Sequence, residues 1–183
     1  MAVAEAYPTI APGDHKAFME HALDAARRAP SGPDKFCVGA CLVDEDTGKI
    51  LSTGYSLELP SDRPGDPGRV HAEHCCFVKI ADQHGVEETR IGDVLPTNTV
   101  LYTTMEPCNS RLTGNKPCVE RILGLSGAIK TIYVGIREPD TFKVVNSGQH
   151  RLEKAGIRMV FVEGEGLQDR ILEVSMTGHG KKQ

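Results

Sequence analysis

Apolar residues recur along the chain at two spacings, which divide it into alternating helices and strands. An apolar stripe with helical spacing follows Asp14, a residue type that is typical of a helix N-cap. Apolar residues alternate over residues 130–136, as in a strand. The pattern predicts strands over residues 36–43, 49–55, 97–104, 130–136 and 157–162, and helices over residues 14–29, 71–84, 117–124, 149–155 and 167–176. Because helices are interleaved with five strands, we expect an α/β fold, a three-layer α/β/α sandwich.

The length and the distribution of proline indicate one domain with short appendages. A chain of 183 residues is long enough for one full hydrophobic core. Residues 1–13 hold two prolines and few core positions, so we expect an extended N-terminal arm. Residues 14–176 are expected to form the single domain, and residues 177–183 a flexible tail.

Charge and cysteine usage narrow the class of protein. The formal charge of −4 argues against a nucleic-acid binder with a broad basic face. Six cysteines without a pairing pattern do not suggest a secreted disulfide scaffold, so we expect the cytoplasm, or also the nucleus. The sequence shows no signal peptide and no apolar run near the ~20 residues of a membrane span, and we expect no membrane partner.

The candidate metal-binding and catalytic residues lie in the triplet His71-Ala72-Glu73 and at two later cysteines, Cys108 and Cys118. One imidazole and two thiolates suit Zn²⁺, and three protein ligands leave the fourth position for water. The metal lowers the pKa of such a water toward about 7. Glu73 is then expected to carry protons rather than to bind metal, as in zinc deaminases with this signature. His71 and Cys118 each fall at the start of a predicted helix, so two helix N-termini are expected to meet at one zinc.

The other cysteines and histidines are given structural roles. We interpret Cys37 and Cys41, four apart on one strand face, as core thiols, and likewise the adjacent pair that follows His74. His15 and His21 lie outside the apolar stripe of their helix and are expected to be solvent-exposed. His74 could support the metal site, but a solvated helix residue is the favoured interpretation.

The motifs resemble those of a known family. His71-Ala72-Glu73 with Met105-Glu106-Pro107-Cys108 is similar to the cytidine deaminase superfamily, most of which has Pro-Cys-x-x-Cys. Here the second cysteine comes ten positions later, a spacing that resembles the deaminases of riboflavin biosynthesis. The amino-acid sequence of residues 110–118 resembles that of their fungal branch. The stretches 37–40 and 137–142 are similar to their first strand and to a later loop.

The resemblance implies a mixed five-stranded sheet, with the first two strands antiparallel and the later ones largely parallel. It also implies a zinc-dependent hydrolytic deaminase that removes the 2-amino group of 2,5-diamino-6-ribitylamino-4(3H)-pyrimidinone 5′-phosphate, releases ammonia and works as a homodimer. Residues 61–68 then form an insertion of unknown use. The residues expected at the substrate are Ala72 through its backbone, Ser56, Glu58, Arg111, Asn115, Asp140 and Thr141, with Lys116 as a further loop cation.

Two alternatives remain open from the residues themselves. One is a deaminase of cytidine or of another nucleoside or nucleobase. The other is a zinc-stabilised scaffold subunit without catalysis, although a structural zinc needs a fourth ligand rather than a proton carrier such as Glu73. The polar loop between Cys108 and Cys118 favours a substrate with a polyol or phosphate group, because cations and amides match those oxygens.

Overall fold

The computed structural model describes residues 6–60, 69–139 and 147–180. The strands are β1 (Gly39–Asp44), β2 (Lys49–Tyr55), β3 (Thr99–Met105), β4 (Ile129–Ile136) and β5 (Arg158–Phe161). The helices are α1 (His15–Ala26), α2 (Ala72–His84), the 3₁₀ helix η1 (Glu88–Asp93), α3 (Cys118–Leu123), α4 (Gly148–Lys154) and α5 (Leu167–Ser175). No helix within these described ranges is both long and apolar enough to cross a membrane.

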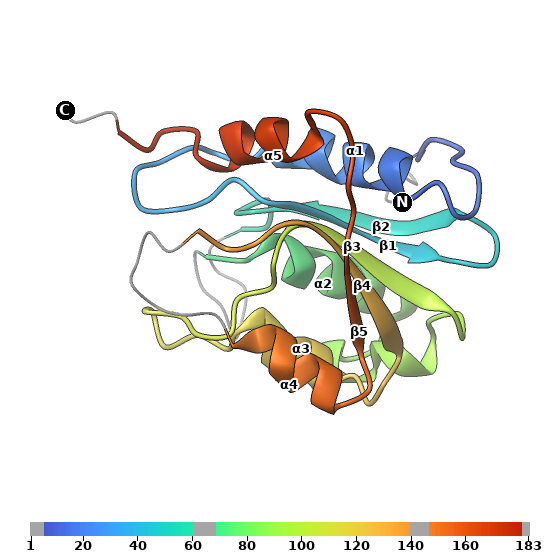
Figure 1. Cartoon of the computed structure of the whole chain (residues 1–183). Coiled ribbons are helices and arrows are strands. Elements are labelled where there is room, and N and C mark those ends of the chain that lie inside the picture. The colour runs from blue at the N-terminus through green and yellow to red at the C-terminus, as the bar shows by residue number, and fades with distance from the viewer. Residues whose placement is uncertain (1–5, 61–68, 140–146, 181–183) are drawn as a thin grey trace.

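The five strands form one mixed sheet in the order β2-β1-β3-β4-β5. The strand β1 pairs antiparallel with both β2 and β3, whereas β3, β4 and β5 run parallel. Helices α1 and α5 cover one face of the sheet, and α2, α3 and α4 cover the other (Figure 1). The predicted three-layer α/β/α sandwich and its mixed sheet are therefore confirmed.

The strand directions gather several loops at one edge of the sheet. Because β1 is antiparallel to β3, the start of β1 lies beside the end of β3, with Ala40 opposite Thr103. The end of β2 lies at the same edge, since Gly39 pairs with Tyr55. The end of β4 joins them through the parallel pairing of Met105 with Ile136. Ligands of open α/β sheets bind at such an edge.

Two glycines let the helices approach the sheet closely. A Cβ built on Gly39 would lie 1.9 Å from the carbonyl oxygen of Ala22 in α1. A Cβ on Gly54 would lie 2.5 Å from the carbonyl oxygen of Ala72, the first residue of α2. Any side chain at these positions would push the helix away, and Gly54 thereby fixes the N-terminus of α2 over β2.

Most predicted elements are confirmed within a few residues, and two boundaries differ for identifiable reasons. The helix α1 ends at Ala26 rather than near 29, because the next amides bond three residues back, with Arg28 N–H on Ala25 and Ala29 N–H on Ala26. Cys37 precedes β1, since its N–H donates to the carbonyl of Ser175 at the end of α5 instead of to a strand. Cys37 and Cys41 are both buried core thiols, as expected, but they do not share a strand face.

The expected solvent exposure of three histidines was wrong. His15 Nδ1 lies 2.7 Å from the Tyr102 hydroxyl, and His21 Nε2 lies 2.8 Å from the Thr53 hydroxyl. Each ring therefore joins α1 to the sheet. His74 is 4% exposed and bonds to a glutamate, as described below. Apolar spacing alone missed these roles, because a histidine beside an apolar stripe can find a polar partner on a distant strand.

Residues 177–180, the described part of the expected flexible tail, contact the body of the protein. The His179 ring stacks on Phe36 with 5.2 Å between centroids, and its Nε2 lies 2.8 Å from the Lys35 carbonyl oxygen. This end of the chain therefore packs against the segment that leads into β1. Residues 181–183 and the 61–68 insertion lie outside the described residues.

Candidate active site

Three side chains of the predicted metal site converge from three elements. His71 is the N-cap residue of α2, Cys108 follows the end of β3, and Cys118 is the first residue of α3. The His71 ring makes no capping hydrogen bond. Its Nδ1 instead lies 3.5 Å from the Cys108 Sγ and 3.6 Å from the Cys118 Sγ. Two helix N-termini and the end of a central strand thus meet at one point, as the sequence predicted.

The spacing of these atoms fits one tetrahedral zinc ion. With Zn–N near 2.05 Å and Zn–S near 2.3 Å, a tetrahedral angle separates N from S by about 3.6 Å. The two measured N···S distances agree with this value, and all three ligand atoms lie within 4.8 Å of one another. One imidazole with two thiolates is also a common catalytic zinc set. His71, Cys108 and Cys118 would therefore hold zinc and leave one position of the metal open.

Hydrogen bonding prepares the two cysteines unequally. A hydrogen bond from the Cys118 thiol, together with His71, lowers the pKa of the Cys108 thiol despite its burial. The backbone N–H of Cys118 also donates to the Cys108 Sγ at 3.4 Å. Donation to Cys108, followed by burial, raises the pKa of the Cys118 thiol. A lowered pKa at Cys108 favours the thiolate form that zinc requires.

Glu73 lies beside the metal ligands without being one of them. It stands in the first turn of α2 and is 3% exposed. Its Oε2 lies 3.4 Å from the Cys118 Sγ, within hydrogen-bond range. Burial raises the pKa of the Glu73 carboxyl, while the neighbouring His71 opposes that rise. A carboxyl with a raised pKa holds a proton more readily than an ordinary glutamate, which suits a group that must both take and release one.

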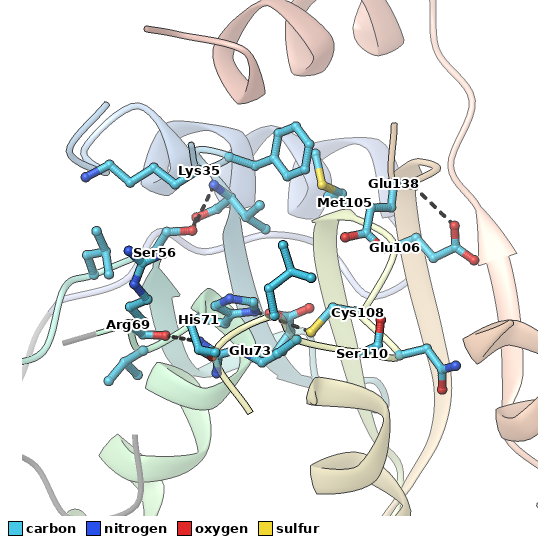
Figure 2. Close-up of a pocket in the computed structure, with 18 of the residues that line it drawn as sticks. Lys35, Ser56, Arg69, His71, Glu73, Met105, Glu106, Cys108, Ser110 and Glu138 are labelled. Atoms are coloured by element: carbon cyan, nitrogen blue, oxygen red, sulfur yellow. Dashed lines mark hydrogen bonds between the residues drawn. The ribbon is translucent and has the colours of Figure 1, made fainter. Parts of the chain in front are cut away.

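A pocket of about 310 Å³ opens above these groups at the edge of the sheet. Figure 2 shows His71, Glu73 and Cys108 at its base, with Lys35, Ser56 and Arg69 along one side and Met105, Glu106 and Glu138 along the other. The volume is at the lower end for small-ligand sites and suits one compact ring with a substituent.

The predicted substrate contacts fall into three groups. Ser56 and Arg111 line the pocket, as expected. Ala72, Glu58 and Asn115 are not among the described residues that line it. Asp140 and Thr141 lie outside the described residues. Residue type does not decide the outcome, since polar side chains occur both among the residues that line the pocket and among those that do not.

Glu58 has a clear alternative role. Its Oε1 lies 2.6 Å from the Lys79 ammonium, and its Oε2 accepts from the Tyr55 N–H. The carboxylate therefore ties the loop after β2 to α2. Ala72 is fully buried under the floor. Lys116 is exposed, and its ammonium lies near Gly124 at the end of α3, away from the pocket.

The sequence analysis missed several residues that line the pocket. The missed polar residues on its walls are Asp34, Lys35, Arg69, Glu106, Asn109, Ser110, Thr113 and Glu138. Arg69 lies two positions before His71, and that nearness was the one available signal. Lys35 stands far from any motif, and only the antiparallel pairing of β1 with β3 brings it to the site.

A buried charged cluster holds the two helices of the metal site together. His74 Nε2 in α2 lies 2.7 Å from the Glu88 Oε2 in η1. Arg121 in α3 donates through Nη1 to both Glu88 oxygens, at 2.9 and 3.2 Å. Burial would raise the pKa of Glu88, but His74 and Arg121 outweigh it and lower that pKa. The cluster fixes α2 against α3 and so maintains the spacing between His71 and Cys118.

The fold, with a buried acid beside three zinc-type ligands, is that of the zinc-binding deaminase class. Residues 12–136 match the family model for the cytidine and deoxycytidylate deaminase zinc-binding region, and the chain belongs to that family. The metal of this family is zinc, which agrees with the donor set described above.

Similar solved structures fall into two groups that differ in sequence identity to this chain. The chain is 38% identical to the Aspergillus oryzae Rib2 deaminase, a C-terminal deletion mutant solved at pH 6.5, over 91% of this chain and 92% of that one, with a TM-score of 0.78. The same relative has been solved in complex with DARIPP, with equal similarity. A Thermotoga maritima deaminase/reductase shares the fold at 23% identity and a TM-score of 0.61, over 88% of this chain and 39% of that one.

A curated relative from Schizosaccharomyces pombe is described as a diaminohydroxyphosphoribosylamino-pyrimidine deaminase. It is 34% identical over 171 residues, which is 93% of this chain. The chain spans 37% of the length of that relative.

Proposed function

We propose that the protein is a zinc-dependent hydrolase that removes the 2-amino group of 2,5-diamino-6-ribitylamino-4(3H)-pyrimidinone 5′-phosphate and releases ammonia. The observation that carries this proposal is the buried Glu73 carboxyl beside the His71, Cys108 and Cys118 cluster, at the base of a pocket. The relatives named for pyrimidine deamination, one of them in complex with DARIPP, support the choice of substrate.

His71, Cys108 and Cys118 would hold the zinc, which supplies Lewis acidity for activating water and for stabilising negative charge. The Glu73 carboxylate takes a proton from the attacking water as the oxygen bonds to C2 of the ring. Glu73 then gives a proton to the ring nitrogen. Glu73 next takes the proton of the new hydroxyl on C2 and gives it to the amine, so that the C2–N bond breaks, ammonia leaves and a carbonyl forms at C2. The burial that raises the pKa of Glu73 suits a group that must hold the proton between these transfers.

Backbone groups complete the proposed machinery. The helix α2 begins next to His71, and we assign its first N–H groups, with the partial positive charge of a helix N-terminus, to the site. Such donors stabilise the oxygen that gains negative charge during attack on C2. We thus assign to Ala72 a role for its backbone N–H group and none for its side chain.

The experiment is an ammonia-release assay on three compounds: the phosphorylated ribitylaminopyrimidine, its dephosphorylated form and cytidine. We expect kcat/KM to fall in that order, because a site built to bind a charged group rejects analogues that lack it. Equal turnover of cytidine would favour the nucleoside deaminase alternative. No ammonia from any of the three, with zinc bound, would favour the scaffold alternative.

We further propose a homodimer in the cytoplasm, or also in the nucleus. All six cysteines are free thiols, which suits a reducing compartment. The family resemblance of the motifs supports the dimer. Light scattering of the zinc-loaded protein would test it, and a mass of one chain would contradict it.

A further inference from the structure

One large apolar side chain stands in water at the mouth of the pocket. In the part of the chain that the structure describes, two large apolar side chains are strongly exposed, Leu112 at 85% and Leu172 at 45%. Leu172 lies on α5 and does not line the pocket. Single exposed leucines are common on protein surfaces, but Leu112 also lines the pocket that has Glu73 at its base. Its exposure therefore coincides with the place where a ligand enters.

The chain presents Leu112 on a closed turn. The Gly114 N–H donates to the Arg111 carbonyl oxygen at 3.1 Å, which makes Leu112 and Thr113 the two central residues of a four-residue turn. Gly114 has a φ of +76°, a conformation that glycine adopts without strain. The Thr113 hydroxyl oxygen accepts from the Asn115 N–H at 3.4 Å. The Leu112 side chain thus projects from the tip of a defined turn.

Two side-chain contacts anchor this turn to the rest of the site. Arg111 Nη2 donates to the carbonyl oxygen of Arg69, in the loop before α2, at 2.7 Å. At the start of the same loop, the Asn109 Oδ1 accepts from the Nη1 of Arg151, in α4, at 2.7 Å. Asn109 directly follows the metal ligand Cys108. The tip of the turn is therefore placed beside the pocket in advance, so that its contact with a ligand costs little ordering.

The pocket beside Leu112 offers apolar surface to a flat ring. Val70 and Met105 line it and are 1% and 3% exposed, so they belong to the rigid body of the protein. The other apolar side chains along it, apart from Leu112, are buried or half-buried. An aminopyrimidine carries its polar groups at its edge and has two apolar faces. Leu112 is the side chain that can cover a face otherwise left in water.

We propose that Leu112 packs against one face of the pyrimidine ring of the substrate, while the amino-bearing edge of the ring faces Glu73. This inference rests on the proposed function, which supplies a pyrimidine substrate. Leu112 contributes to binding by removing apolar surface from water, whatever charge the tail of the substrate carries. It is a specificity-determining residue that selects a flat ring with an apolar face.

Leu112→Ala tests the contact by kinetics. Each buried methylene contributes roughly a fourfold change in affinity, and only one side of the leucine meets the ring, so we expect KM to rise about tenfold. The rise should be equal for the phosphorylated pyrimidine and its dephosphorylated form, with kcat nearly unchanged, because the contact is the same before and during the reaction. The melting temperature should not fall, since a side chain that is 85% exposed adds little to the folded state.

Three further variants control this result. Leu112→Met keeps an apolar side chain of similar volume and should retain most of the affinity, whereas the polar Leu112→Asn should behave like Leu112→Ala. Leu172→Ala removes the same atoms from an exposed position on α5 and should leave KM unchanged. An unchanged KM in Leu112→Ala, or an equal rise in Leu172→Ala, would rule out the ring contact. A fall in both kcat and melting temperature would mean that Leu112 serves the fold instead.

Calorimetric titration with the bare ring, 2,5,6-triamino-4(3H)-pyrimidinone, separates this inference from the proposed function. Wild-type protein loaded with zinc should bind it with a negative heat-capacity change, which marks apolar burial. Leu112→Ala should bind it about tenfold more weakly, with a smaller heat-capacity change.

That binding result without ammonia release from the phosphorylated pyrimidine would sink the proposed function and leave the ring contact standing. Turnover of the phosphorylated pyrimidine, with equal binding of the bare ring by wild type and Leu112→Ala, would overturn the contact alone. Failure of the wild-type protein to bind the bare ring would also count against the contact.

Discussion

The floor of the pocket is built by the ends of helices and of a central strand, whereas its rim is built by loops. The floor residues Glu73, Cys108 and Cys118 are each at most 7% exposed. On the rim, the Arg69 side chain is 53% exposed, and Lys35 and Arg111 project from irregular segments. The floor is held in place by packing and by buried hydrogen bonds, and the rim by a few polar contacts.

This difference separates the reaction from the choice of substrate. Hydrolysis at zinc needs ligand atoms placed within tenths of an ångström, and regular elements supply that precision. Recognition of a charged tail tolerates movement, and loops that vary around a rigid scaffold can supply it. Changes in the floor should therefore abolish the chemistry, while changes in the rim should alter KM or stability and leave kcat close to wild type.

Removal of a zinc ligand should have the largest effect. Cys118→Ala leaves two protein ligands where zinc needs three, so we expect loss of both bound zinc and turnover. Metal analysis by mass spectrometry and the ammonia assay measure this. Cys75→Ala is the control, because Cys75 is a buried thiol of α2 that bonds to the Tyr55 carbonyl and should not affect zinc. Full zinc content with unchanged turnover in Cys118→Ala would refute the ligand assignment.

Glu73→Gln should separate chemistry from structure within the floor. The amide keeps the size of the side chain but cannot carry a proton, so we expect turnover to fall by roughly 10²–10⁴-fold. Zinc content and the melting temperature should stay near wild type. Glu120→Gln, which changes an exposed acid in the first turn of α3, is the control and should leave turnover, zinc content and melting temperature unchanged. A Glu73→Gln enzyme that works within a few-fold of wild type would mean that another group carries the proton.

The buried cluster of His74, Glu88 and Arg121 should affect the stability of the protein in a pH-dependent way. Glu88→Gln leaves the buried Arg121 and His74 without their carboxylate, and we expect a loss of about 3 kcal/mol of unfolding free energy at neutral pH. Glu87→Gln, at an exposed neighbouring position, is the control.

The sign of the pH dependence follows from the lowered pKa of folded Glu88. A group with a depressed folded pKa stabilises above its unfolded pKa of about 4.3 and loses that effect as pH falls through the folded value. The gap between wild type and Glu88→Gln in urea unfolding should therefore be full at pH 7 and shrink below about pH 4.3. A gap that widens on acidification would contradict this role.

Ser56→Ala should give the smallest effect, although Ser56 lines the pocket. The hydroxyl accepts from the Val38 N–H at 3.1 Å and lies 3.4 Å from the Val38 carbonyl oxygen. We therefore expect a loss of about 1 kcal/mol of stability, with little change in KM for either pyrimidine. Ser52→Ala, a buried serine that bonds to the Cys76 carbonyl, is a control for stability without contact with the pocket. A tenfold rise in KM would show that the Ser56 hydroxyl binds substrate directly.

Regular elements were predictable because their signals are local. The apolar period, the cap at Asp14 and the glycines that end helices act within a few residues, so the five strands and the helices followed from the sequence. The short helix η1 was missed, since it lies in a polar connection without an apolar period. The same locality explains the errors at His15, His21 and His74, whose partners Tyr102, Thr53 and Glu88 lie on other elements.

The chain alone determined the floor of the pocket, because few residue types bind zinc and because helix starts at His71 and Cys118 fix where the ligands stand. Only the tertiary structure decided the rest of the rim, beyond Ser56 and Arg111. Lys35 belongs to no motif and reaches the pocket because β1 runs antiparallel to β3, and Glu138, which no site prediction named, reaches it because β4 runs parallel to β3. Strand direction is set by the packing of the whole sheet and not by neighbours in sequence. A local sequence pattern can therefore specify the zinc ligands but not the residues from other elements that complete the rim of the pocket.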